Sequence, residues 1–238
     1  MNLIRFSFKN ASILSICLLI LLSLLAAYAV NFKNTAPNIK IELPLPRYSS
    51  KTSVEYAIKQ RRSIREYKPE AITLADLSQL LWAAQGITSQ KGFRSSPSAG
   101  ALYPLQIYIV VGNLVDLPKG VYRYLSENHT LESLTDKDIR KELAKASYDQ
   151  SYIQNSSVDI IIAANYKKTT KKYGKRGKRF VYMEAGHVAE NIYLQCVSLG
   201  LGTVSVGGFQ DKKIKSILKI NDDPLYIMPV GKIVNNAE

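Results

Sequence analysis

Three arginines lie close together in the sequence RRSIR. Arg61, Arg62 and Arg65 flank Ser63, which adds a hydroxyl group to the cluster. Guanidinium groups stay charged and bind phosphate oxygens through two hydrogen bonds at once. The cluster is therefore a candidate phosphate site, although a run of charge near a helix end is more often a solvated surface.

Two adjacent glycines, Gly207 and Gly208, end a short run of strand-forming residues that starts at Thr203. Glycine lets another group approach the backbone closely, because it has no side chain to obstruct it. The pair indicates either a surface on which something flat or bulky rests or, more often, a bulge or tight turn.

A loop of small residues and a strongly basic segment are further candidates for binding. The loop reads SSPSAG over residues 95–100 and leads into a predicted strand, so a ligand would be able to approach its backbone. We expect the basic segment to be a mobile surface loop or, as the alternative, a surface that binds anions. Its cations are Lys167, Lys168, Lys171, Lys172, Lys175, Arg176, Lys178 and Arg179.

The overall composition predicts one large globular domain. Of 238 residues, 46% are hydrophobic and 21% are charged, which is enough apolar material for a real core. The net charge of +13 suits nucleic acid, an anionic membrane surface or an anionic ligand. The two cysteines imply no disulfide framework. No zinc-ligand spacing and no GxSxG, GxGxxG or P-loop motif occurs, which argues against the enzyme classes that use them.

The N-terminal part of the chain predicts contact with a membrane. Residues 11–30 form an uncharged apolar run about as long as a bilayer-spanning helix. Residues 1–30 fit a signal peptide cleaved near Ala29 and fit an uncleaved anchor equally well, with a slight preference for the anchor. Basic residues on both sides of the run leave its orientation open. Residues 31–51 are predicted to be a linker, and residues 52–238 the folded domain.

A long helix over residues 179–199 must position most of these candidates. Its apolar stripe is wider than one face, which predicts that the helix is buried on most sides, and Gly200 is expected to end it. Other helices are expected after capping boxes that begin at Thr52, Thr73 and Thr135. Strands are expected at residues 106–111, 121–125, 130–134 and 158–164.

Together these motifs resemble the nitroreductase superfamily. The resemblance is carried by RRSIREY, SSPSAGALYPLQIYIVV, KYGKRGKRFVYMEAGHVAENIYLQCVSLGLGTVSVGGF and PLYIMPVGK, and it covers residues 52–232. Within the superfamily the chain is most similar to the SagB-type branch, the thiazole- and oxazole-forming dehydrogenases. The resemblance implies an α+β fold, a sandwich around a mixed sheet, and an intertwined homodimer with one FMN in each interface pocket.

The resemblance also implies roles for individual residues. Arg61, Arg62, Ser63 and Arg65 would hold the FMN phosphate and one edge of the flavin. Pro97, Ser98 and Ala99 would reach the flavin from the partner subunit. Gly207 and Gly208 would lie against the ring, and Lys232 would add a cation near the phosphate. In the azole-forming branch a Lys-Tyr pair ahead of the long helix is implicated in removing the substrate proton. Here Lys172 and Tyr173 match its position, with a chance match in a basic segment as the alternative.

The function implied is that of an FMN-dependent oxidoreductase that transfers hydride through its flavin. One version takes hydride from NAD(P)H and reduces a nitro compound or quinone. The other oxidises an azoline in a peptide and requires partner cyclase proteins. The alternative is a membrane-associated FMN-binding or scaffold protein without turnover. Neither a metal nor a nucleic-acid partner is expected.

Overall fold

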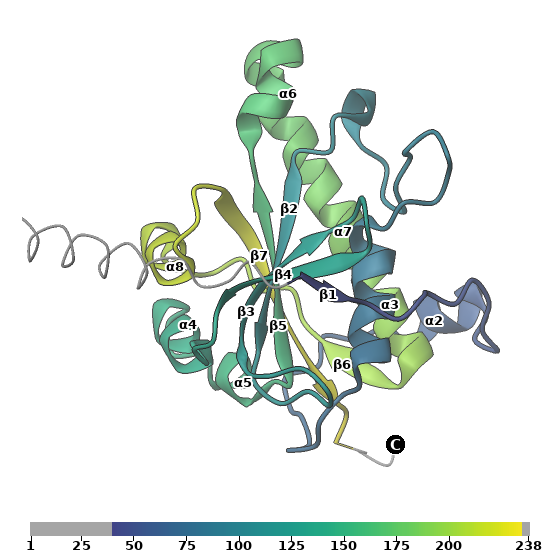
Figure 1. Cartoon of the computed structure of the whole chain (residues 1–238), viewed down its shortest axis with the longest axis vertical. Coiled ribbons are helices and arrows are strands. Elements are labelled where there is room, and N and C mark those ends of the chain that lie inside the picture. The colour runs from purple at the N-terminus through teal and green to yellow at the C-terminus, as the bar shows by residue number, and fades with distance from the viewer. Residues whose placement is uncertain (1–39, 235–238) are drawn as a thin grey trace, which may run out of the picture. The chain divides into compact units, whose positions relative to one another are not determined.

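A seven-stranded sheet runs through the molecule in the order β1-β4-β3-β2-β5-β7-β6 (Figure 1). The computed structural model describes residues 40–234. All pairs between these strands are antiparallel, whereas the resemblance implied a mixed sheet. The strands are β1 (Lys40–Glu42), β2 (Leu105–Val111), β3 (Gly120–Leu125), β4 (Thr130–Thr135), β5 (Val158–Ala164), β6 (Leu201–Thr203) and β7 (Asp223–Lys232).

The centre of the sheet is formed by β2 and β5, whose sequences are almost continuously apolar. They pair in register from Leu105 opposite Ala164 to Val111 opposite Val158. Every residue of β5 is buried, because helices cover both faces of the sheet. The strand predicted at residues 158–164 is therefore confirmed, as is the hairpin of β3 and β4.

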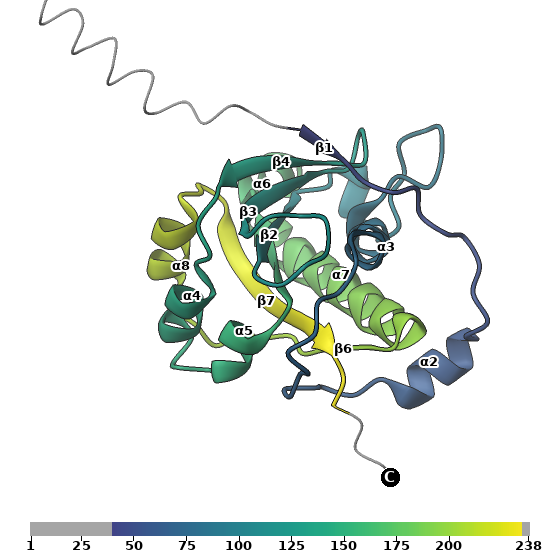
Figure 2. The same cartoon turned by 60° about the horizontal axis from the view of Figure 1, so that its bottom comes forward.

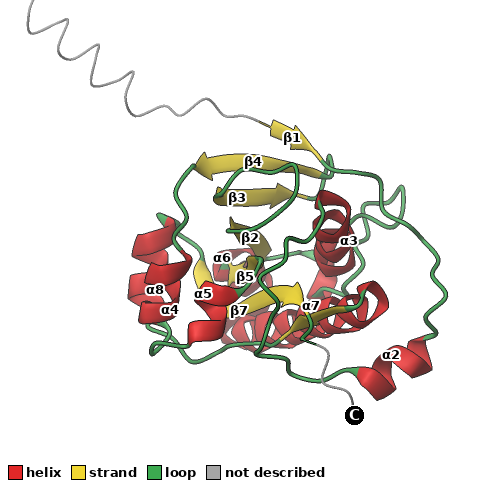
Figure 3. Ribbon diagram, turned by 90° about the horizontal axis from the view of Figure 1, so that it is seen from below, coloured by secondary structure: helices red, strands yellow, loops and turns green. Residues whose placement is uncertain are grey.

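Helices pack on both faces of the sheet (Figure 3). Helices α3 (Leu74–Gln85) and α7 (Gly177–Leu199) share one core with the sheet. Helices α4 (Arg140–Ala146), α5 (Ser151–Asn155) and α8 (Asp211–Leu218) cover the other face. Helix α2 (Val54–Gln60) contacts α7 and lies away from the sheet (Figure 2). The predicted α+β architecture is confirmed.

Helix α7 buries one face of its surface. Val181, Val188 and Ile192 are fully buried against the sheet, whereas Tyr182 and Met183 are each more than half exposed. Within a single chain, the expectation of burial on most sides is therefore wrong, and α7 keeps a free face. Gly200 ends the helix as predicted, in the left-handed conformation that favours glycine (φ 68°).

The predicted helix starts are correct in one case of three. Thr73 and Asp76 form the expected capping box of α3. Helix α2 is capped by Ser53, one residue later than predicted. Helix α4 has no side-chain cap. Its expected partner Asp138 instead binds the guanidinium of Arg140, at 2.9 and 2.8 Å.

The basic segment is helical, so the prediction of a mobile loop is wrong. It forms α6 (Tyr166–Tyr173), the 3₁₀ turn η2 (Gly174–Arg176) and the first turn of α7, and it lies at one end of the molecule (Figure 1). Lysine has a good intrinsic helix propensity, and Thr169 is buried between the lysines of α6. The cations thus occupy ordered positions on a helical surface.

The folded part begins before the Thr52 expected. Strand β1 pairs with β4, and Leu43 is buried in the core beneath it. The predicted N-terminal apolar run of residues 11–30 lies outside the described residues. Among residues 40–234, no helix combines the length and the apolarity needed to cross a bilayer.

Candidate functional site

The arginine cluster lies between the end of α2 and strand β6. The amide of Ile64 donates to the carbonyl of Thr203 at 2.9 Å, which fixes this segment beside β6. Arg61 places its guanidinium carbon 5.2 Å from the ring centroid of Tyr193 on α7. Among residues 40–234, no carboxylate forms an ion pair with Arg61 or Arg65. These two cations are therefore available to an anionic ligand.

Tyr193 connects the arginine cluster with the strand that leads to the glycine pair. Its hydroxyl lies 3.1 Å from Ser63 Oγ and accepts a hydrogen bond from the amide of Ser205 at 2.7 Å. Ser205 stands two residues before Gly207. The tyrosine therefore holds two predicted parts of the site, far apart in sequence, at one place.

A second connection runs from Arg65 to Gly208. The guanidinium carbon of Arg65 lies 5.9 Å from the ring centroid of Tyr152, and the Tyr152 hydroxyl donates to Gln150 Oε1. Gln150 in turn donates to the carbonyl of Gly208 at 3.0 Å. Arg61, Ser63, Arg65 and the glycine pair therefore belong to one connected group.

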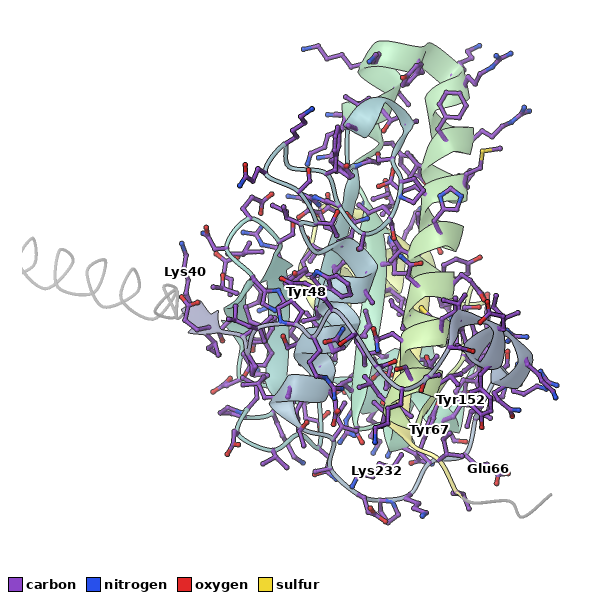
Figure 4. The ribbon with its side chains drawn as sticks, turned by 90° about the vertical axis from the view of Figure 1, so that its right-hand side faces the viewer. Lys40, Tyr48, Glu66, Tyr67, Tyr152 and Lys232 are labelled. Carbon is purple, nitrogen blue, oxygen red and sulfur yellow. The ribbon has the colours of Figure 1, made fainter. Side chains whose placement is uncertain are left out.

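The charged groups of Arg62 and Lys232 bind backbone carbonyls and a carboxylate of the chain. The exposed Arg62 donates to the carbonyls of Lys59 and Arg61, which close the end of α2. The Lys232 ammonium lies 3.1 Å from a carboxylate oxygen of Glu70, so its charge is already paired. Figure 4 shows Lys232, Tyr67 and Tyr152 at the same end of the molecule.

The glycine pair is exposed and is not required by the fold of the chain itself. Neither Gly207 nor Gly208 has the positive φ that favours glycine. A Cβ atom at Gly208 would meet nothing within 4 Å, and one at Gly207 would only touch Tyr226 at 3.6 Å. A tight turn, the simpler interpretation of the sequence, therefore does not explain why glycine occupies these two positions. The bare backbone fits a ligand that lies directly against it.

A cavity of about 530 Å³ opens beside Gly207. Tyr166, Tyr182, Phe209 and Tyr226 supply aromatic walls. Aromatic walls next to exposed backbone suit a flat, partly apolar ligand. A second cavity, of about 410 Å³, lies between the segment of residues 47–54 and α3 and α7, and of the candidate binding residues only Ser95 lines it.

The remaining predicted residues form a separate group near the N-terminal end of α7. Ser98 Oγ donates to Glu184 Oε2 at 2.6 Å. The Lys172 ammonium and the Tyr173 hydroxyl lie 2.9 and 2.6 Å from the position that a Cβ atom would take at Gly100. The Lys-Tyr pair therefore abuts the loop that carries Pro97, Ser98 and Ala99.

The arginines contact the C-terminal half of α7 and the Lys-Tyr pair precedes its N-terminal end, whereas the cavity beside Gly207 is lined by Tyr182 from the N-terminal half of the helix. Gly177, next to the Lys-Tyr pair, and Tyr193, next to the arginines, are separated by on the order of 24 Å at a rise of about 1.5 Å per residue. The single chain thus brings the predicted site together as two clusters: an arginine–glycine cluster (Arg61, Ser63, Arg65, Gly207, Gly208) and a loop cluster (Ser98, Lys172, Tyr173).

Sequence reasoning missed Glu184, Tyr193 and Tyr152. Glu184 is only 2% exposed, and burial raises its pKa to about 7, although the hydrogen bond from Ser98, the neighbouring Gln85 amide and the cations Arg94 and Lys168 act to lower it. A signal was present for this residue: it is an acidic side chain at a buried position of an apolar helical stripe. The tyrosines read as ordinary core residues and gave no such signal.

The sequence profile described as "Nitroreductase family" matches residues 58–232. The chain belongs to the nitroreductase family. This family member is 48% identical over 192 residues to the nitroreductase homologue MJ1384 of Methanocaldococcus jannaschii, across 81% of this chain and 96% of that protein. It is 25% identical to the microcin B17-processing protein McbC of Escherichia coli, across 59% of this chain and 54% of McbC.

Solved structures agree with this family membership. A crystal structure of a nitroreductase homologue from Ralstonia eutropha matches with a TM-score of 0.73 and 28% identity, over 83% of this chain and 90% of that one. The NADPH:FMN oxidoreductase of Vibrio harveyi, complexed with NAD+, shares the fold with a TM-score of 0.56 and 19% identity, over 77% and 70% of the two chains. The superfamily resemblance is confirmed, and McbC is consistent with the predicted branch.

Proposed function

We propose that this protein is an FMN-dependent oxidoreductase. One observation carries the proposal: two arginines without ion-pair partners in the described chain lie in one connected group with an exposed glycine pair whose backbone has open space before it. FMN combines a phosphate dianion with a flat ring, and this group offers a partner for each. The flavin chemistry of the family and the FMN oxidoreductase of the same fold support the choice of cofactor.

FMN bound there would supply the hydride-accepting and hydride-donating ring, and the chain would supply binding and electrostatics. Arg61 and Arg65 would bind the phosphate or the electron-rich edge of the ring. Ser63, fixed by Tyr193, would add a neutral donor. Gly207 and Gly208 would admit the ring face and offer backbone amides without a titrating side chain. Fixed donors of this kind stabilise charge that develops during reaction.

We infer a homodimer in which each pocket takes the loop cluster from the partner subunit. The supporting observation is the free apolar surface of the single chain. Helix α2 buries only Ala57 and exposes Val54, Tyr56 and Ile58, and the free face of α7 exposes Met183. Exposed apolar side chains of this kind favour contact with a second protein surface. A two-fold axis that sets two α7 helices antiparallel would bring opposite ends together.

A SagB-type azoline oxidation is the more specific version of this activity. It is favoured by the position of Lys172 and Tyr173, which touch the same loop as the residues expected at the flavin. The sequence similarity to McbC supports a peptide substrate, with NAD(P)H-driven reduction of a nitro compound or quinone as the competing version.

Membrane attachment through residues 11–30 is part of the proposal. Their apolar, uncharged sequence supports an anchor that stays on the mature protein. N-terminal sequencing of the protein isolated from its native membrane tests this point. A mature protein that begins at Val30 would show cleavage and exclude the anchor.

The purified full chain should show the absorbance spectrum of bound flavin. Arg61→Ala and Arg65→Ala should each weaken FMN about 10- to 100-fold, because a hydrogen bond to a charged group contributes about 1.5–3 kcal/mol. Gly208→Val should abolish FMN binding without lowering thermal stability, since the chain leaves room for the side chain. Lys59→Ala is the matched control for lost charge. Unchanged FMN affinity in all three variants would overturn the proposal.

A further inference from the structure

A chain of polar contacts ties the loop that contains Ser98 to helices α3 and α7. Arg94 donates to Gln85 Oε1 at 3.1 Å, and its guanidinium carbon lies 4.7 Å from the ring centroid of Tyr103. The amide of Tyr103 donates to Ser98 Oγ at 2.9 Å, and Ser98 donates to Glu184 Oε2 at 2.6 Å. Glu184 therefore anchors this chain of contacts to α7.

The carboxyl group of Glu184 is unusual for a helix core. Its second oxygen, Oε1, is buried without a hydrogen-bond partner among residues 40–234, and the same holds for the neighbouring Gln85 Nε2. Buried polar atoms are nearly always paired, so such a group requires an explanation beyond packing. The charged side chains that act on it are Arg94 from the preceding loop and Lys168 from α6.

The loop that Glu184 holds is conformationally strained. Gly100, Ala101 and Tyr103 all have positive φ angles, of 63°, 54° and 44°. Residues with a Cβ atom adopt this region at a cost in free energy and persist there only when surrounding contacts hold them. Lys172 and Tyr173 lie against Gly100 in this same stretch. Release of the loop would therefore move the Lys-Tyr pair relative to Ser98.

We propose that Glu184 is a positioning residue whose hydrogen bond to Ser98 holds the strained loop, and with it Lys172 and Tyr173, in the reactive arrangement. The catalytic purpose of this arrangement rests on the proposed function. The hydrogen bond and its hold on the loop do not depend on that function. Charging the buried carboxyl favours states in which it reaches water. The hydrogen bond from Ser98 favours the charged carboxylate, but burial outweighs it, so the held loop loses stability relative to opened states as the pH rises through about 7.

Amide hydrogen exchange of the flavin-free full chain tests the latch. Exchange of residues 98–103, corrected for the intrinsic effect of pH, is measured at pH 6 and pH 8. Glu184→Ala should speed it about tenfold or more at pH 6, since the hydrogen bond to Ser98 is lost. Glu184→Gln, which keeps an acceptor but no charge, should stay protected at both pH values, whereas the wild type loosens at pH 8. Glu190→Gln, an exposed position on the same helix, should behave as the wild type.

Two results would overturn the latch. One is loop protection that Glu184→Ala leaves unchanged, and the other is a pH response that persists in Glu184→Gln. If Glu184→Ala fails to fold, Ser98→Ala removes the same hydrogen bond together with the acceptor of the Tyr103 amide, and the loosening is then read from the amides of residues 99–102. FMN affinity of the same variants is a separate readout. If the loop loosens while FMN affinity stays unchanged, the loop is not part of the flavin site. That result would count against the proposed function but not against the latch.

Discussion

Ser63 and Tyr193, separated by 130 positions in the chain, place their hydroxyl groups 3.1 Å apart. The same tyrosine hydroxyl accepts a hydrogen bond from the Ser205 amide. One side chain on α7 therefore aligns the arginine segment with the residues before the glycine pair. The phosphate-binding and ring-binding parts of the proposed FMN site are thereby set relative to each other by Tyr193.

Tyr193→Phe should weaken FMN binding about tenfold, because it removes the hydroxyl that orders both segments. The ring that stacks under Arg61 stays in place, so the free energy of unfolding should fall by only about 1 kcal/mol. Fluorescence titration of FMN and chemical denaturation measure the two effects. Tyr148→Phe, an exposed position, is the control. Equal FMN affinity in both variants would contradict the role of Tyr193.

The buried carboxyl of Glu184 should make stability depend on pH. Its pKa is about 7 in the folded chain against an ordinary 4.5, so the folded state binds the proton more tightly than the unfolded state does. The contribution of the protonated carboxyl to the free energy of unfolding is therefore fully present below pH 4.5. It is lost progressively as the pH rises through about 7. Between pH 5 and pH 8 the wild type should lose about 3 kcal/mol of unfolding free energy relative to Glu184→Gln. Parallel pH profiles for the two proteins would show that the carboxyl does not titrate there.

Lys172→Ala and Tyr173→Phe should slow azoline oxidation by about 10²- to 10⁴-fold, the usual contribution of a general base. FMN content and flavin reduction by NAD(P)H should stay intact, because the arginine–glycine cluster is untouched. Lys171→Ala and Lys175→Ala control for the charge of the basic helices. Lys168 is unsuitable as a control, because its ammonium contacts the carbonyl of Tyr103 at 3.4 Å. Equal losses in the control variants would assign the effect to charge and not to the pair.

The free face of α7 should carry part of the dimer interface. Met183→Glu is expected to shift the protein toward monomer in sedimentation velocity while the chain stays folded, because this side chain is 54% exposed. Val188→Glu should instead unfold the chain, since it places an unpaired charge in the core beneath the sheet. An intact dimer in Met183→Glu that still binds FMN would place the interface elsewhere.

Local patterns predicted those parts of the fold that local interactions determine. The apolar run of β5, the hairpin of β3 and β4, and the Thr73 capping box were readable from neighbouring residues. Strand β1 was not, because three residues at a sheet edge acquire their strand character only by pairing with β4. The free face of α7 was also missed, because an apolar stripe does not show how much of it the same chain covers.

The candidate site likewise contains residues that local sequence predicts and connections that it does not. The arginine cluster and the glycine pair were visible in residue type and spacing, and the resemblance gave them a shared purpose. Their connection through Tyr193 and Tyr152 depends on contacts between residues far apart in sequence, which no local pattern contains. Lys232 matched its motif in sequence, yet its charge is paired with Glu70, a partner visible only in the fold.

The separation of the arginines from the Lys-Tyr pair along α7 has a genetic consequence. If each pocket draws one cluster from each subunit, an Arg61→Ala chain and a Lys172→Ala chain are complementary. Each is impaired in azoline oxidation as a pure dimer, but a mixed dimer contains one pocket with both clusters unaltered. Co-expression of the two defective genes should therefore restore activity that neither gives alone. Co-expression of a gene that carries both substitutions should not restore the activity of either single variant.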